Sequence, residues 1–121
     1  MAAKPLGNPH ALIDMIGYLA MTIDARADGD GERSYTMSLL DKGVLHCGKK
    51  IAEEGAELAL ALAAQGEAEA AGEAADLIYH ILVGLRAKGV SLDQVSDALH
   101  VRQGISGLDE KANRSDDRSE R

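Results

Sequence analysis

Four acidic residues fall in two pairs that could bind a metal ion. Glu54 and Glu57 are three residues apart, and so are Glu73 and Asp76. Residues three apart share one face of an α-helix, so each pair would present its two carboxylates in the same direction. Hard divalent cations prefer oxygen ligands, and Mg²⁺ commonly binds one or two carboxylates together with water and substrate phosphates. A site for a divalent cation is therefore one hypothesis, and solvated acidic helix faces are the ordinary alternative.

The two pairs fall on segments whose hydrophobic pattern predicts helices. Apolar residues recur at helical spacing over 44–65 and 67–88, with Gly66 between the segments and Gly89 after the second. Because the link between them is so short, we expect an antiparallel hairpin. Such a hairpin would bring the two acidic pairs toward one interface.

Both acidic pairs lie beside apolar positions rather than opposite them. In the first helix, Glu54 lies close to an apolar stripe, whereas Glu53 is turned toward water. In the second, the segment 77–85 is apolar nearly all round, so we expect Asp76 and His80 to point into, or to the edge of, a packed region. Carboxylates converging there would repel one another unless protons or cations neutralise them. The apolar stripe consists of Val44, Ile51, Leu58 and Leu62.

The rest of the chain also reads as helical, and no segment has a convincing strand pattern. Ser91 and Gln94 have the spacing of a capping box, which indicates where the last helix begins. We therefore predict an all-α fold, with one catalytic domain at 1–105. The C-terminal segment 106–121 is expected to be partly disordered because its end is charged or polar. The additional elements expected are a helix over 9–27, a DGDG break at 28–31, a short helical piece over 34–40 and a helix over 91–104.

Composition limits the class of protein. Apolar residues make up 45% of the 121 residues, yet Phe and Trp are absent, and such a shallow core favours oligomerisation. The formal net charge of −7 argues against nonspecific nucleic-acid binding. A polyanionic ligand would need metal ions to bridge it to so acidic a chain. The single cysteine, Cys47, is taken as a small apolar residue, and with no signal peptide or membrane-length apolar run we expect a cytoplasmic protein.

Four separate stretches resemble one family. They are SYTMSLLDKG at 34–43, KKIAEEGAE at 49–57, EAADLIYHILVGL at 73–85 and SGLDEKANR at 106–114. The paired carboxylates resemble the metal motif of the MazG-like superfamily of all-α nucleotide pyrophosphatases. Within it, the Ser-Tyr-Thr, Tyr-His and C-terminal segments are similar to the phosphoribosyl-ATP pyrophosphohydrolases. The resemblance covers roughly 31–114 and implies a four-helix-type MazG-like bundle completed by dimerisation.

The resemblance also implies an activity and a metal site. The activity is hydrolysis of phosphoribosyl-ATP to phosphoribosyl-AMP and pyrophosphate, the second step of histidine biosynthesis. Mg²⁺ would be held by Glu54, Glu57, Glu73 and Asp76. Either Glu53 or Glu57 would accept the proton of the attacking water, and the choice between them stays open. Family members form dimers and higher assemblies, so a homodimer or homotetramer is expected.

Four candidate substrate-binding residues each have a structural alternative. Lys50 could contact phosphate, or form an ion pair with an acidic residue one turn later. Arg33 could meet a phosphate, or belong to a solvated loop. Tyr35 could stack on a base or ribose, or anchor the core. His80 could bind phosphate or orient Asp76, or be a satisfied structural histidine.

The C-terminal segment carries two more candidates. Lys111 and Arg114 could close over substrate phosphates, including across a dimer, or belong to a solvated tail. Two rival functions remain beside the main expectation. A housekeeping pyrophosphatase for other (deoxy)nucleoside triphosphates would use the same carboxylates, and a noncatalytic helical interaction module would bind no Mg²⁺.

Overall fold

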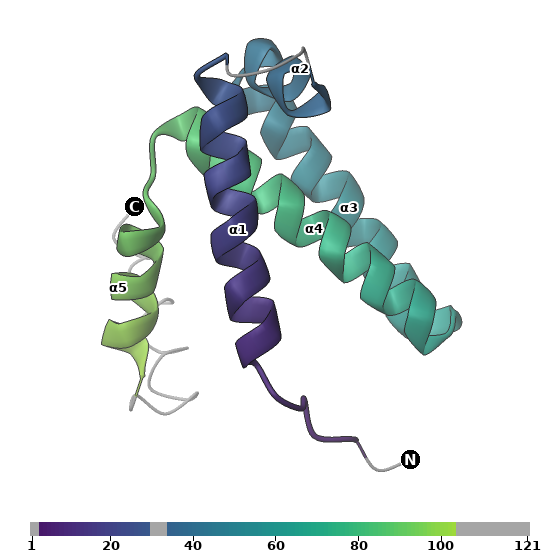
Figure 1. Cartoon of the computed structure of the whole chain (residues 1–121). Coiled ribbons are helices and arrows are strands. Elements are labelled where there is room, and N and C mark those ends of the chain that lie inside the picture. Colours follow the sequence, from purple (N-terminus) through teal and green to yellow (C-terminus); the bar gives the residue numbers. More distant parts are fainter. Residues whose placement is uncertain (1–2, 30–33, 104–121) are drawn as a thin grey trace, which may run out of the picture. The chain divides into compact units, whose positions relative to one another are not determined.

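In the computed structural model, residues 3–29 and 34–103 are described, and every regular element within these ranges is an α-helix. The all-α prediction is confirmed, and each helix begins and ends within two residues of its expected bounds. The helices, shown in Figure 1, are α1 (His10–Ala27), α2 (Tyr35–Lys42), α3 (Val44–Ala64), α4 (Glu67–Lys88) and α5 (Leu92–Arg102).

A side-chain cap and two glycines explain where α2 begins, where α2 gives way to α3 and where α4 ends. The Ser34 hydroxyl accepts a hydrogen bond from the Met37 backbone N–H at 3.2 Å and so begins α2. Gly43 has φ of +91°, a conformation that L side chains rarely adopt, and it lets α3 begin directly after α2. Gly89 closes α4 in the left-handed conformation, after a last turn that carries Arg86 and Lys88.

The α3–α4 hairpin is the frame of the first compact unit, residues 1–89 (Figure 1). The two helices are joined through Gln65 and Gly66 and run antiparallel, as predicted. Helices α1 and α2 pack against one end of the hairpin, where α3 begins and α4 ends. Arg86 of α4 also donates to Asp24 of α1 at 2.9 Å. This covered end holds the apolar core.

The core is small and draws on all four helices of this unit. Cys47 behaves as the expected small apolar residue: its Sγ contacts the Leu39 carbonyl oxygen at 3.5 Å, and burial raises the pKa of the thiol. The apolar stripe expected on α3 is only partly covered, because Val44 and Leu62 remain 47% and 70% exposed in this chain. The core residues are Ile23, Leu39, Cys47, Leu82 and Val83.

The second compact unit begins at Val90 and contains α5. The predicted capping box is present: the Ser91 side chain accepts from the Gln94 backbone N–H, and the Gln94 side chain accepts from that of Ser91. None of the described helices is both long and apolar enough to span a bilayer. The expected domain boundary at 105 and the segment 106–121 lie outside the described residues.

Candidate functional site

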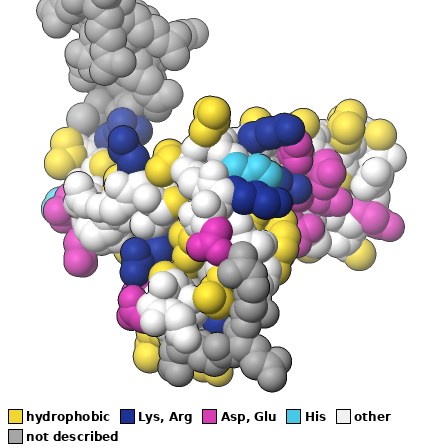
Figure 2. Space-filling model, turned by 90° about the horizontal axis from the view of Figure 1, so that it is seen from above, with side chains coloured by type: hydrophobic (Ala, Val, Ile, Leu, Met, Phe, Trp, Pro, Cys, Tyr) yellow, Lys and Arg dark blue, Asp and Glu magenta, His cyan; other side chains and the backbone are white. Residues whose placement is uncertain are grey.

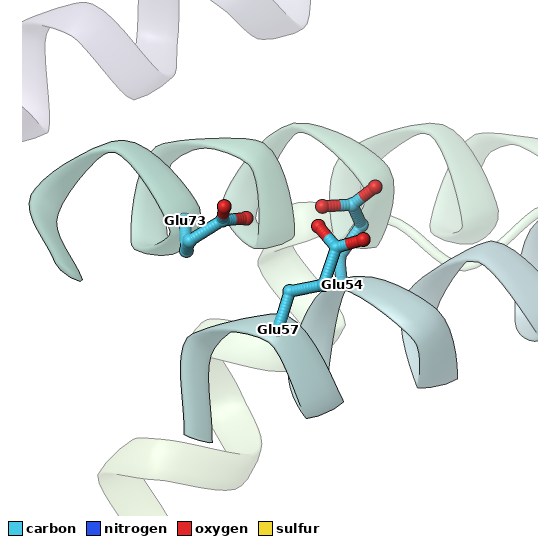
Figure 3. A group of neighbouring side chains, drawn as sticks. All are labelled: Glu54, Glu57 and Glu73. Carbon is cyan, nitrogen blue, oxygen red and sulfur yellow. The ribbon is translucent and has the colours of Figure 1, made fainter. Parts of the chain in front are cut away.

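Three carboxylates converge between the two helices of the hairpin (Figure 3). Glu54 and Glu57 project from α3, and Glu73 projects from α4 toward them. Each offers one oxygen atom, and these three oxygens all lie within 4.8 Å of one another. We call this group the carboxylate cluster. It brings Glu73, one carboxylate of the second acidic pair, to both carboxylates of the first pair at the hairpin interface.

The cluster brings negative charge into a sheltered place. Glu54 is only 9% exposed and Glu73 is half-buried, while Glu57 is exposed. Burial raises the pKa of the Glu54 carboxyl, and the neighbouring charge of Glu57 raises it further. The pKa of Glu73 is raised by burial and by its contact with Glu57. Within the described residues, these groups therefore destabilise one another when all are ionised.

Two oxygens of the cluster are suited to a cation. Glu54 Oε2 and Glu73 Oε2 are buried and have no hydrogen-bond partner among the described residues. A buried polar atom without a partner is costly, and an ionised carboxylate more so. Several convergent oxygen atoms with no donor between them are the ligand set that Mg²⁺ prefers. The donor set therefore fits a hard divalent cation.

Asp76 differs from its expected position. It lies outside the group whose ligand atoms converge, and it is exposed rather than pointing into a packed region. Within 52–60 and 67–76, Glu54 is the only buried residue, so an acidic side chain on this part of α4 can reach water. The Asp76 charge still raises the pKa values of Glu54 and Glu73, which places it near the cluster.

Lys50 forms the ion pair that the sequence spacing allowed. Its Nζ lies 3.1 Å from Glu53 Oε2 and 3.9 Å from Glu54 Oε1. The hydrogen bond with Glu53 raises the pKa of Lys50 and lowers that of Glu53. Glu53 is exposed, as expected, and takes no part in the cluster. In Figure 2, acidic side chains gather on one part of the surface, with Lys or Arg and His side chains at its edge.

A cluster of aromatic and polar side chains joins α2 to α4 beside the carboxylates. The buried His80 ring donates from Nδ1 to the backbone oxygen of Asp76 at 2.8 Å, because a carbonyl can only accept. Its Nε2 is thus left to accept from the Tyr35 hydroxyl, 3.5 Å away. His80 is therefore a satisfied buried histidine, and its bond reaches the backbone of Asp76 rather than the carboxylate.

Tyr35 is not a core anchor, since it is 56% exposed. Its ring stacks on Tyr79, with centroids 6.3 Å apart and an interplanar angle of 18°. Tyr79 in turn hydrogen-bonds through its hydroxyl to Thr36. Thr36 was not singled out from the sequence, although it lies in the Ser-Tyr-Thr segment, because no spacing rule connects it with a residue 43 positions away. Arg33, Lys111 and Arg114 lie outside the described residues.

Comparison with known proteins identifies one family. A family model for phosphoribosyl-ATP pyrophosphohydrolase matches residues 17–103. The match starts within α1, upstream of the segments that carried the resemblance in the sequence, and ends before the segment 106–114.

Three curated relatives are similar over most of this chain. The phosphoribosyl-ATP pyrophosphatase 1 of Bradyrhizobium diazoefficiens is 51% identical over 98 residues, which cover 81% of this chain and 92% of that protein. The phosphoribosyl-ATP pyrophosphatase of Caulobacter vibrioides is 47% identical over 86% of this chain and 96% of that protein. The histidine biosynthesis bifunctional protein HisIE of Wolinella succinogenes is 44% identical over 88% of this chain, but only 46% of that protein.

Proposed function

The chain belongs to the phosphoribosyl-ATP pyrophosphohydrolase family, and from this premise we propose that it hydrolyses phosphoribosyl-ATP to phosphoribosyl-AMP and pyrophosphate in histidine biosynthesis. The observation that carries the proposal is the carboxylate cluster, with two buried oxygens that lack hydrogen-bond partners among the described residues. An acidic chain can bind a polyphosphate at such a site only when cations lie between the two. The proposed place of action is the cytoplasm.

The proposed cofactor is Mg²⁺, held by Glu54, Glu57 and Glu73 with Asp76 as a further ligand. Three of these four carboxylates already converge, and Asp76 lies close enough to affect the pKa of two of them. When bound there, Mg²⁺ would neutralise charge on the phosphate oxygens and favour departure of pyrophosphate.

Hydrolysis adds water across the bond between the α and β phosphates, and one proton must leave the attacking water. Glu57 and Glu53 are the candidate acceptors. Glu57 is better supported, because its exposed carboxylate belongs to the cluster. Glu53 is held by Lys50, and that contact lowers its pKa and makes it a weaker base.

Three of the proposed substrate contacts, Tyr35, Lys50 and His80, lie within the described residues. Tyr35 offers an exposed ring, backed by Tyr79, on which a base or ribose could stack. Lys50 lies at the edge of the cluster and is suited to a phosphate oxygen. His80 supports Tyr35 through its Nε2. Arg33 is proposed as a further phosphate contact because it directly precedes the Ser-Tyr-Thr segment, and Lys111 and Arg114 because they lie in the C-terminal stretch that resembles the family.

The protein is also proposed to form a homodimer or homotetramer. Several large apolar side chains of α1 and α3 are more than half exposed in the single chain. Because the core of one chain is so small, burying these side chains against a second copy would add to its stability. Sedimentation velocity should give a dimer or tetramer, and a monomer at micromolar concentration would contradict this part of the proposal. These side chains include Leu12, Met15, Tyr18, Leu60 and Leu62.

The decisive experiment measures pyrophosphate release from phosphoribosyl-ATP and from a panel of deoxynucleoside triphosphates, with Mg²⁺ and with EDTA. We expect Mg²⁺-dependent release from phosphoribosyl-ATP and little from the panel. Equal or faster release from the deoxynucleotides would indicate a general nucleotide pyrophosphatase instead. Absence of metal-dependent release from every substrate would favour a noncatalytic role.

A further inference from the structure

Lys50 is the only basic side chain that forms an ion pair with the carboxylate cluster, among the ion pairs of the described residues. Its Nζ lies 3.9 Å from Glu54 Oε1 and 3.1 Å from Glu53 Oε2. The pair is not in open solvent, since the side chains of Lys50 and Glu54 are 24% and 12% exposed. Its charge therefore acts on Glu54 with less screening than a surface lysine would.

The two oxygens of Glu54 have different surroundings. Oε1 faces the Lys50 ammonium, whereas Oε2 is buried and has no hydrogen-bond partner in the described part of the chain. Oε2 is thus the Glu54 oxygen without a partner, and Glu54 offers one of its oxygens, with Glu57 and Glu73, to a cation that would bind between the three residues. The ammonium and such a cation would share one carboxylate, so two positive charges would compete for it.

We propose that Lys50 is the internal counter-ion of the carboxylate cluster, and that its ammonium turns from Glu54 to a phosphate oxygen of the substrate when a divalent cation binds. The inference rests on the proposed function. Lys50 would thus have two successive partners. Glu54 is its partner in the metal-free protein, and a phosphate oxygen is its partner when substrate is bound.

The chemistry of lysine suits this exchange. Its ammonium is a compact charge with three donors on a flexible four-carbon stem, so it can change partners without moving α3. Its second carboxylate partner, Glu53, is exposed and lies outside the cluster, so Lys50 can keep that contact while leaving Glu54. A phosphate oxygen then replaces the carboxylate oxygen as the acceptor, and the positive charge is never left without a negative neighbour.

The structural alternative is an ordinary ion pair along a helix. Pairs of this kind stabilise a helix by about 0.2–0.5 kcal/mol and have no connection with metal binding. The two interpretations differ in sign for one measurable quantity. If Lys50 competes with the metal, removing its charge tightens metal binding; if it only steadies the helix or Glu54, metal binding is unchanged or weaker.

The experiment compares Lys50→Gln with Lys50→Arg and with the adjacent Lys49→Gln as matched controls. Isothermal titration calorimetry with Mn²⁺, on the full chain without substrate, gives the metal affinity. We expect Lys50→Gln to bind Mn²⁺ about tenfold more tightly than the unmodified protein. Lys50→Arg keeps the charge, and Lys49 has no ion pair with the cluster among the described residues. Both controls should stay within about twofold of the unmodified protein.

Steady-state kinetics with saturating Mg²⁺ tests the second partner. Lys50→Gln should raise KM for phosphoribosyl-ATP more than it lowers kcat, and Lys50→Arg should restore most of the loss. Unchanged or weaker Mn²⁺ binding by Lys50→Gln, with an active and metal-binding unmodified protein, would overturn the counter-ion role alone. Tighter binding with an unchanged KM would overturn the phosphate contact. An unmodified protein that binds no Mn²⁺ would overturn the proposed function as well.

Discussion

The two ends of the α3–α4 hairpin differ in what they bury between the same pair of helices. At the covered end, α1 and α2 pack over the start of α3 and the finish of α4, and the buried side chains include Leu39, Leu82 and Val83. At the other end, within 52–76, the buried residues are Glu54 and the small Ala61. An apolar core thus occupies one end and a group of carboxylates the other.

The difference separates stability from chemistry. Burying apolar side chains at the covered end favours folding, whereas gathering carboxylates at the open end opposes it. The free energy gained by apolar burial at the covered end can therefore offset the repulsion between carboxylates at the open end, because both ends belong to the same two long helices. Tyr35 and Thr36 of α2 contact His80 and Tyr79 of α4, and so link the covered end to the cluster.

The largest expected effect is on catalysis at the open end. Glu57→Gln keeps the shape of the side chain but removes a charged ligand, so kcat should fall by about 10³-fold or more. The free energy of unfolding should be unchanged or higher, because one repelling charge has gone. Enzyme assays and denaturant titrations on the same preparation measure both quantities.

Glu69→Gln is the control for this substitution, because Glu69 is an exposed residue in the first turn of α4 and lies outside the cluster. It should retain near-normal turnover. Near-normal turnover in Glu57→Gln as well would remove Glu57 from both the metal site and the proton transfer. It would also weaken the contrast between the two ends of the hairpin.

The next effect is on stability at the covered end. Leu39 is 2% exposed, so Leu39→Ala removes buried apolar volume and should lower the free energy of unfolding by about 3 kcal/mol. The kcat of the protein that remains folded should change little. Leu39→Met conserves volume and should lose less than about 1.5 kcal/mol. Equal losses in the two variants would mean that Leu39 does not pack as closely as the structure indicates.

The smallest effect is a pH dependence at the open end. In the metal-free protein the pKa of Glu54 is raised above its ordinary value, chiefly by burial. A raised carboxyl pKa means that the folded state holds the proton more tightly than the unfolded state. Stability is then fully retained below the unfolded pKa and is lost as pH rises through the folded pKa.

Glu54→Gln should therefore be more stable than the unmodified protein in EDTA at about pH 7.5, and the gap should close toward pH 4. Urea unfolding at several pH values measures the gap, with Glu69→Gln as the control. A gap that stayed constant with pH would show that ionisation of Glu54 is not the cause. Saturating Mg²⁺ should stabilise the unmodified protein more than the variant.

Most of the fold could be predicted from the sequence, because it depends on local rules. Helical periodicity, the Ser34 cap, the Ser91–Gln94 capping box and the glycines at 43 and 89 act over a few residues. The starts of α2 and α5 and the ends of α2 and α4 followed from them. The short link between α3 and α4 also fixed their antiparallel direction. Which face of α3 stays exposed did not follow, since that depends on how far α1 and α2 reach over the hairpin.

The site was predictable only in part. Spacing placed Glu54 and Glu57 on one face of α3, and the hairpin brought Glu73 to them. Spacing could not decide that Asp76, on the same side of α4, would be exposed, nor that His80 would bond to the backbone of Asp76.

Residue types and their periodicity therefore determined the helices, the pairing of α3 with α4 and the convergence of acidic residues. Tertiary structure alone decided which carboxylate oxygens are buried without a partner, that Thr36 bonds Tyr79, and that Lys50 faces one oxygen of Glu54. The reason is physical: helix formation depends on neighbours within one or two turns. Burial and hydrogen-bond partnership depend instead on atoms that the chain brings together from far apart.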